Sequence, residues 1–192
     1  DDLHFLHSPK MPKPEEAETT RQHGIDSLIE EMIVRKELAD NYCYYQSDYD
    51  SLDAAPNWAK ETIEKHRDDP REHLYTQEDL ENAQTHDSAW NAAQKQLTST
   101  GKMHGYMRMY WAKKVLEWTK SPEQAIEFLI YMNDHYSIDG GDPNGYAGIL
   151  WSVGGVHDRP WQEREVFGKI RYMNYGGLKR KFDIEDYESQ WL

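Results

Sequence analysis

Three tryptophans, Trp90, Trp111 and Trp118, lie in residues 87–118 and are the side chains best suited to chemistry. Trp111 and Trp118 are seven residues apart in a segment that we predict to be one helix, and two helical turns place both indoles on the same face. A break at residues 99–101 lets the preceding helix fold back, which would bring Trp90 beside the other two. Indole rings at this spacing can pass an electron from ring to ring. Aromatic residues at helical spacing are also typical of an ordinary core, so the spacing alone leaves both interpretations open.

Two polar side chains fall inside apolar helical segments. Arg108 stands among methionines and aromatic residues, where a guanidinium needs an ion-pair partner or a ligand. Asn133 ends the apolar run 125–132, and a buried amide must be hydrogen-bonded. Residues 139–145 are rich in Asp and Gly but lack the alternating ligands of a calcium-binding EF-hand. We expect them to form a tight turn that approaches a ligand closely, which glycines permit.

Composition excludes several classes of protein. The single cysteine, Cys43, rules out an internal disulfide framework and fits a reducing compartment. No run of apolar residues is long enough to span a membrane, and residues 1–16 have no apolar signal core. No Cys/His cluster has metal-ligand spacing, and no glycine-rich phosphate-binding motif is present. We therefore expect an intracellular protein, cytoplasmic or nuclear, with no metal site.

The charge of the chain is divided unevenly along the sequence. The net charge is −13, of which residues 1–100 contribute −12 and residues 101–192 only −1. Between residues 159 and 181 there are seven bases and two acids. A local basic stretch on an acidic body can still contact phosphates, although it can also be a solvated face. The seven bases are Arg159, Arg164, Lys169, Arg171, Lys179, Arg180 and Lys181.

Every long periodic segment of the chain predicts a helix, and no segment shows the alternation of a strand. Residues 1–25, with three prolines, predict a loop, and Ser27 with Glu30 has capping-box spacing for a helix that runs to about residue 41. The other helices are predicted to start near residues 56, 76, 87, 103, 121, 147, 160 and 183. The sequence therefore predicts an all-α fold.

Two long motifs resemble a known family. TGKMHGYMRMYWAKKVLEW, followed by YMNDHYSIDGGDPNGYAGILWSVGGVHDRPWQEREVFGKIRYM, is similar to the flavin-binding domain of class II cyclobutane pyrimidine dimer DNA photolyases. The similarity covers about residues 27–187. It implies the helical FAD-binding domain of the photolyase/cryptochrome fold, with residues 26–192 as its C-terminal portion. The N-terminal α/β antenna domain of the family, and an upstream part of the helical domain that contacts the FAD phosphates and adenine, have no counterpart in this sequence.

The resemblance implies roles around the flavin ring. It matches Arg108 and Asp139 to an ion pair beside the isoalloxazine ring. It matches Asn133 to the asparagine that faces flavin N5 and favours the reduced states. It also implies that Trp111, Trp90 and Trp118, in that order outward from the flavin, carry the electrons of photoreduction. Two tyrosines fall where the family has accessory redox residues, namely Tyr75 and Tyr110.

The resemblance also implies roles at the DNA lesion. Glu31 lies at the edge of an apolar stripe, where most carboxylates are surface residues; in the family the matching glutamate hydrogen-bonds the pyrimidine dimer. A carboxyl in such a site would have a raised pKa. Trp151 and Met109 are expected to touch the dimer, and flat apolar walls suit flipped bases. The expected DNA contacts after them are Arg159, Trp161, Lys169 and Arg171.

The function that the resemblance implies is light-driven repair of pyrimidine dimers in UV-damaged DNA, with reduced FAD as electron donor. The expected partners are damaged DNA and the missing N-terminal part of the photolyase, as a separate chain or a removed segment. Two alternatives remain. One is a cryptochrome-like flavin photoreceptor without repair, and the other is a flavin-free helical module for DNA binding or scaffolding.

Overall fold

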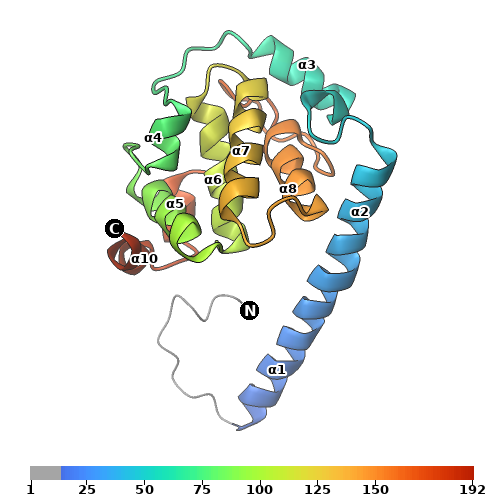
Figure 1. The fold of residues 1–192 in the computed structure, drawn as a ribbon, viewed down its shortest axis with the longest axis vertical. Helices are drawn as coiled ribbons and strands as arrows, with labels where there is room; N and C mark the ends of the chain where they lie inside the picture. Colours follow the sequence, from blue (N-terminus) through green and yellow to red (C-terminus); the bar gives the residue numbers. More distant parts are fainter. Residues whose placement is uncertain (1–13) are drawn as a thin grey trace.

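The computed structural model describes residues 14–192, with side chains from residue 21 onward, and confirms the all-α class. Figure 1 shows one long helix leading into a compact group of shorter helices. Across residues 14–192 no strand forms, and Arg164 and Gly168 make one isolated antiparallel bridge. The elements are α1 Pro14–Ile29, η2 Glu30–Arg35, α2 Lys36–Tyr45, η3 Leu52–Ala54, α3 Asn57–Lys65, α4 Gln77–Glu81, α5 Ser88–Thr100, α6 Gly105–Trp118, α7 Pro122–Tyr136, α8 Pro143–Gly154, α9 Tyr175–Lys179 and α10 Ile184–Trp191.

Local capping chemistry sets most helix starts. The side chains of Asp87 and Ser121 accept hydrogen bonds from the first turns of α5 and α7, and Thr76 forms a complete capping box with Asp79 at α4. These side chains satisfy backbone N–H groups that have no partner within the helix. Gly101 ends α5 in the left-handed conformation, with φ of +71°, which glycine adopts without a steric penalty. The predicted break between α5 and α6 is thereby confirmed.

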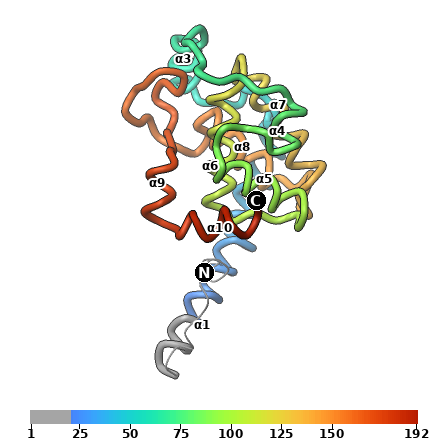
Figure 2. The backbone as a smooth tube through the Cα atoms, turned by 90° about the vertical axis from the view of Figure 1, so that its left-hand side faces the viewer, coloured from blue at the N-terminus to red at the C-terminus, as the bar shows by residue number. Residues whose placement is uncertain are grey.

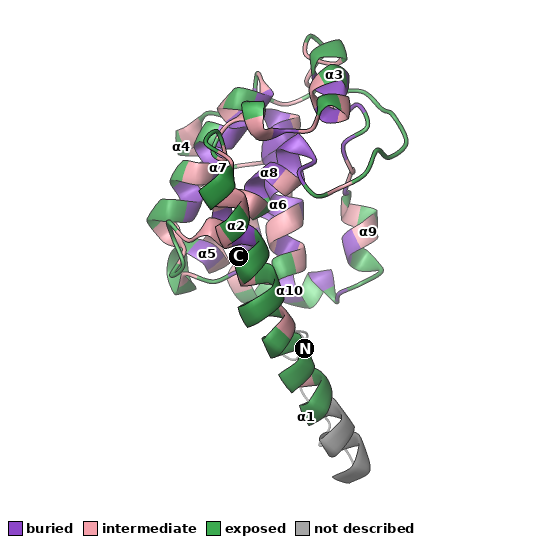
Figure 3. Ribbon diagram, turned by 90° about the vertical axis from the view of Figure 1, so that its right-hand side faces the viewer, coloured by how far each residue is buried: buried purple, intermediate pink, exposed green. Residues whose placement is uncertain are grey.

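The core lies between α5, α6, α7 and α8. Helix α6 packs against each of the other three, and nine of its fourteen residues are buried. Because α6 has no solvated face wide enough for a charged stripe, both of its lysines, Lys113 and Lys114, are among the buried residues. Figure 3 shows the buried positions gathered in these helices. The aromatic stretch that the sequence singles out is therefore the centre of the fold.

The N-terminal helices form one continuous arm over residues 14–45, built from α1, the π-helical segment η2 and α2. Figures 1 and 2 show that the arm leaves the body and extends away from it. The predicted loop over residues 1–25 is therefore wrong for residues 14–25, and residues 1–13 lie outside the described part. Ser27 does not begin a helix, because the arm continues through it. No proline occurs between Pro14 and Pro56 to end the helix.

Residues 155–174 connect α8 to α9 without a regular element, and we call them the α8–α9 loop. The helix predicted to begin at Pro160 is not formed. Backbone groups that follow Pro160 pair across the loop instead. Trp161 N donates to the Lys169 carbonyl at 2.9 Å, and Arg164 N donates to the Gly168 carbonyl at 3.0 Å. None of the helices of residues 14–192 has the length and apolar character needed to cross a membrane.

Candidate functional site

The three tryptophans form a continuous buried chain of indoles, which we call the indole chain. Trp90 lies parallel to Trp111, with ring centroids 6.4 Å apart, and meets Trp118 edge-on at 5.7 Å. All three side chains are at most 2% exposed. Trp90 is the middle member, since it contacts both of the others. The structure thus places the three rings within mutual reach, with Trp90 between Trp111 and Trp118.

Hydrogen bonds fix the orientation of these rings. The Trp90 indole N–H donates to the Trp111 carbonyl at 3.0 Å, and the Trp111 indole N–H donates to Gln94 Oε1 at 2.8 Å. Gln94 is fully buried on α5 and was not predicted. Its only sequence signal is a polar residue one turn after Trp90, on the same helix face. Both buried indole N–H groups are satisfied, so the rings need no water or ligand to hold them.

Arg108 and Asp139 form the expected ion pair. Arg108 Nη1 lies 3.3 Å from Asp139 Oδ2, and about a third to a half of each side chain is exposed. Arg108 is less buried than its apolar sequence neighbours suggested, because it stands at the N-terminal end of α6 where the helix leaves the core. The pair joins α6 to the turn between α7 and α8, and its polar groups face solvent.

Asn133 is 4% exposed and lies next to the same turn. Its amide donates to Asp134 Oδ1 at 3.0 Å and accepts from the Ser137 hydroxyl at 3.4 Å, as a buried amide requires. A Cβ at Gly145 would come within 2.6 Å of Asn133 Nδ2, and one at Gly140 within 2.4 Å of the Asp134 carbonyl. The glycines of the turn therefore allow close approach to α7, where the sequence predicted close approach to a ligand.

A second group of aromatic and cationic side chains alternates along one line, which we call the cation–indole stack. The Arg159 guanidinium lies 5.3 Å from the Trp161 ring, and Arg171 lies 4.7 Å from Trp161 and 5.8 Å from Trp151. Lys113 Nζ lies 4.8 Å from the centre of the Trp151 ring. Cations over indole faces attract the rings. Four residues predicted to contact DNA are thereby brought together.

The α8–α9 loop that carries this stack is attached to α3. The Thr62 hydroxyl accepts from Lys169 N at 3.0 Å, which fixes the backbone beside the predicted DNA contact while the Lys169 side chain stays exposed. His66 bridges Glu163 and Asp69 at 2.9 and 2.6 Å. The hydrogen bonds of its ring to the carboxylates of Glu163, the larger influence, and Asp69 raise the pKa of His66. None of these contacts between distant segments was predicted.

Glu31 is not brought to the other predicted lesion contacts. It is exposed on η2 of the arm, and Cys43, about three helical turns further along, is where the arm touches Pro143 at the start of α8. Trp151 lies towards the other end of α8, while the arm runs away from the body (Figure 1). Met109 is half-buried on α6 and packs against the core. The structure therefore groups Trp151 with Arg171 and Trp161 but leaves Glu31 apart.

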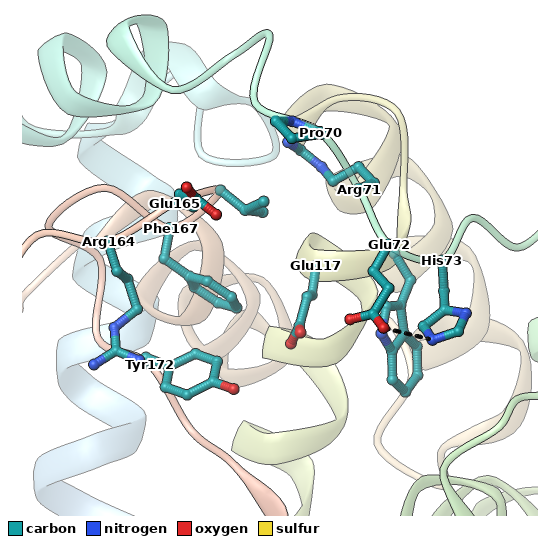
Figure 4. Close-up of a pocket in the computed structure, with 11 residues that line it drawn as sticks. Pro70, Arg71, Glu72, His73, Glu117, Arg164, Glu165, Phe167 and Tyr172 are labelled. Carbon is teal, nitrogen blue, oxygen red and sulfur yellow. Dashed lines mark ion pairs between the residues drawn. The ribbon is translucent and has the colours of Figure 1, made fainter.

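A cavity of about 420 Å³ adjoins the outer end of the indole chain. Trp118 lines it, together with the ion pair of Glu72 and His73 and the stacked pair of Arg164 and Tyr172 (Figure 4). A second cavity, of about 670 Å³, lies between η3 and α3. Neither of these two cavities is lined by Arg108, Asn133 or Asp139. Arg108 and Asp139 are partly exposed at the surface, whereas Asn133 is buried.

Next to this cavity, Tyr75 joins the end of the indole chain. Its hydroxyl pairs with His86 Nδ1 at 2.8 Å, and its ring lies 5.5 Å from Trp118. Tyr110 donates to Asp87, and burial together with that carboxylate raises the pKa of the phenol. Both tyrosines expected as accessory residues thus lie beside the aromatic core.

The fold and site together define an all-helical unit with a buried chain of indoles beside a loop of alternating cations and indoles. Curated proteins similar to this chain are named deoxyribodipyrimidine photo-lyase. The protein of Oryza sativa subsp. japonica is 56% identical over 190 residues, which cover 97% of this chain and 38% of that protein. The protein of Potorous tridactylus is 58% identical over 165 residues, covering 86% and 31%.

An archaeal protein with the same name, from Methanothermobacter thermautotrophicus, is 56% identical over 160 residues, covering 83% of this chain and 36% of its own length. The chain thus spans about a third of the length of the curated relatives it matches. No family model matches it. The comparisons support similarity to photo-lyases of plant, marsupial and archaeal origin.

Proposed function

We propose that this chain takes part in light-driven repair of cyclobutane pyrimidine dimers in DNA, as part of a class II deoxyribodipyrimidine photo-lyase. The observation that carries the proposal is the indole chain, a buried and contiguous path from the α6 turn next to Arg108 to the cavity beside Trp118. The name of the relatives, deoxyribodipyrimidine photo-lyase, supports the same reaction. The chain has no need of a nucleophile or metal ligand for such chemistry.

The residues around Arg108 fit one edge of an FAD site. When bound in its reduced form, FAD supplies the electron that splits the dimer. Arg108 and Asp139 present an exposed ion pair to the polar edge of a ring, and Asn133, with two N–H donors and an acceptor oxygen, can serve a further ring nitrogen beside its own bonds. Trp111 follows Arg108 by one helical turn. These residues hold and orient the group and lead from it into the indole chain.

The remainder of the FAD site is proposed to come from residues that the longer relatives have outside the matched region. The chain accounts for 31–38% of the length of these relatives, and the Arg108–Asp139 ion pair is partly exposed, with room for a further segment beside it. We propose that such a segment is the partner that completes the pocket.

The cation–indole stack is proposed as the DNA-facing surface. Arg159, Lys169 and Arg171 would contact phosphates, and their contribution would weaken with salt. The flat faces of Trp151 and Trp161 suit unstacked bases, since stacking on aromatic side chains needs no particular base. This local basic surface offsets the acidity of the rest of the chain.

A repair assay tests the proposal. The chain is supplied with FAD, either alone or together with the remainder of a similar photo-lyase, and the flavin is chemically reduced. An oligonucleotide that holds one thymine dimer is then added, and the sample is exposed to blue light. We expect loss of the dimer in the light and none in the dark. Bound and reduced flavin without any dimer loss would rule out repair, and no flavin absorption under either condition would favour a flavin-free module.

The role of the indole chain has its own test. Trp111→Phe should slow photoreduction of oxidised FAD by at least about tenfold, because the first ring of the path is lost, while leaving dimer loss by chemically reduced protein intact. Trp191→Phe, on α10 and outside the path, is the matched control. Equal photoreduction by both variants would remove the indole chain from the proposal.

A flavin photoreceptor without repair is the second candidate, favoured by one observation. Glu31, the expected hydrogen-bond partner of the dimer, stands on the exposed arm and not beside Trp151. A photoreceptor would need the indole chain and the Arg108–Asp139 pair but no residue at a lesion. Photoreduction together with absent dimer loss in the assay above would select this candidate.

A further inference from the structure

Lys113 is a buried lysine that the proposed repair chemistry does not use. Its side chain is fully buried on α6, and its Nζ donates to the carbonyl of Ser152 at 2.9 Å. The same atom lies 4.8 Å from the centre of the Trp151 ring. Lysine is almost never fully buried unless it is paired, so its contacts at the end of α8 need a reason.

The surroundings of Lys113 act on its charge in opposite directions. Burial is the largest influence and lowers its pKa to about 7; Asp158 acts to raise the pKa and Arg171 to lower it. Both of these charges come from the α8–α9 loop, while α8 contributes a carbonyl and an indole. On α6 itself, Lys114 pairs with Glu117 and lies over other rings.

Lys113 is also the buried end of the cation–indole stack. The Trp151 ring contacts two cations, Lys113 of α6 and Arg171 of the α8–α9 loop. Arg171 also lies over the Trp161 ring. Trp161 is 39% exposed whereas Trp151 is half-buried. Contacts between cations and rings therefore connect Lys113 with the exposed Trp161.

We propose that Lys113 is a positioning residue for DNA binding, which fixes the Trp151 indole against the end of α8 and thereby sets the pose of Arg171 and Trp161 that meets unstacked bases. The choice of DNA as the ligand rests on the proposed function. The positioning itself needs no ligand, because the contacts that produce it are those of Lys113 and Arg171 with the Trp151 ring.

The first experiment needs no DNA. The indole N–H signal of Trp151 is followed by ¹H–¹⁵N NMR from pH 6 to pH 8.5, with Trp151→Phe to assign it. We expect it to shift with a midpoint near 7 in the wild type, because loss of the Lys113 charge removes the cation from the ring face. A Trp151 signal that does not move in the wild type would overturn the positioning role without any variant.

Two lysine variants separate this effect from general changes. In Lys113→Met the Trp151 signal should no longer titrate, whereas Lys114→Met removes the same charge from the next residue of α6 and should leave the titration as in the wild type. Other titratable groups, such as His66, whose pKa is raised by its hydrogen bonds to Glu163 and Asp69, remain in both variants. Persistence of the titration in Lys113→Met would assign it to another group and refute the proposal.

The second experiment measures affinity for a fluorescein-labelled oligonucleotide with one thymine dimer, by anisotropy at constant salt. For each protein we compare the affinity at pH 6 with the affinity at pH 8.5. We expect this ratio to be at least about threefold larger for the wild type than for Lys113→Met, and the same for Lys114→Met as for the wild type. Wild-type affinity in Lys113→Met at both pH values would contradict the proposal. Absence of any preference for the dimer over intact DNA would instead count against the proposed function, while the NMR titration still decides the role of Lys113.

Discussion

The body and the arm use the same helical structure with opposite results for their apolar side chains. In the body, the rings of the indole chain and the neighbouring aliphatic residues are almost completely buried. On the arm, Leu28 is 56% exposed and Met32 65% exposed, and η2 has no buried residue. Figure 3 shows this contrast as a buried body and an exposed arm. The large aliphatic and methionine side chains exposed on the arm are Ile25, Leu28, Ile29, Met32, Ile33, Val34 and Leu38.

The comparison teaches which contacts define the site. Helix α2 still packs on α8, through the buried Ala39, but the apolar residues from 25 to 34 add little burial to the body. Apolar burial stabilises a fold in proportion to the area removed from water. The aromatic site is therefore complete in its own packing, whereas the outer arm depends on its own backbone hydrogen bonds. Three changes can break or sharpen this contrast.

Trp90→Ala should give the largest effect. Trp90 is fully buried and contacts both other members of the indole chain, so its removal leaves a cavity and takes away the indole donor to the Trp111 carbonyl. We expect the free energy of unfolding to fall by about 3–5 kcal/mol, measured by urea denaturation. Trp90→Phe should cost clearly less. A loss below about 1 kcal/mol for the alanine variant would mean that the body is not tightly packed there.

Lys113→Met should change how stability depends on pH. Burial lowers the pKa of Lys113 to about 7 from 10.5, so between these values the unfolded chain binds more protons and stability rises with pH. We expect the wild type to gain about 2 kcal/mol from pH 7 to pH 9 relative to the variant. His66, with its raised pKa, acts in the opposite direction in both proteins and cancels. Parallel pH profiles from urea denaturation would show that Lys113 does not titrate in this window.

Met32→Glu on the arm should give the smallest effect. An exposed side chain that buries nothing on the body can change with a cost within about 0.5 kcal/mol. The variant should also reduce any self-association of the purified chain, because exposed apolar patches favour contacts between molecules. Urea denaturation and sedimentation velocity test the two parts. A large loss of stability would show that the arm is packed more closely than its exposure indicates.

Much of the body could be predicted from the sequence because its signals are local. Asp87, Ser121 and the Thr76–Asp79 pair act within one turn of the helices that they begin. The approach of Trp90 to Trp111 followed from helical spacing and one short break. The ion pair of Arg108 and Asp139 needed the family resemblance, since 31 residues separate its members.

The rest depended on contacts that no local pattern records. The α8–α9 loop is held by side chains of α3 and its C-cap, His66, which lie 97 and 107 residues earlier than their partners, so the expected helix at Pro160 is replaced by non-local pairing. Lys113 was overlooked because a lysine is usually a surface residue. Its signal was its place in a helix with aromatic residues on all sides. The roles of Glu31, Met109 and the DNA-facing residues stay predictions.

Gly168 has φ of +52°, and a Cβ there would lie 2.2 Å from the Thr62 hydroxyl. The same hydroxyl accepts a hydrogen bond from Lys169 N. The loop can therefore pack against this threonine of α3 only with glycine at position 168, because a side chain there would clash with the hydroxyl. The loop bearing Trp161 is consequently shaped before any ligand arrives. The DNA recognition that we propose for this loop would therefore be that of a rigid template, in which little conformational entropy is lost on association.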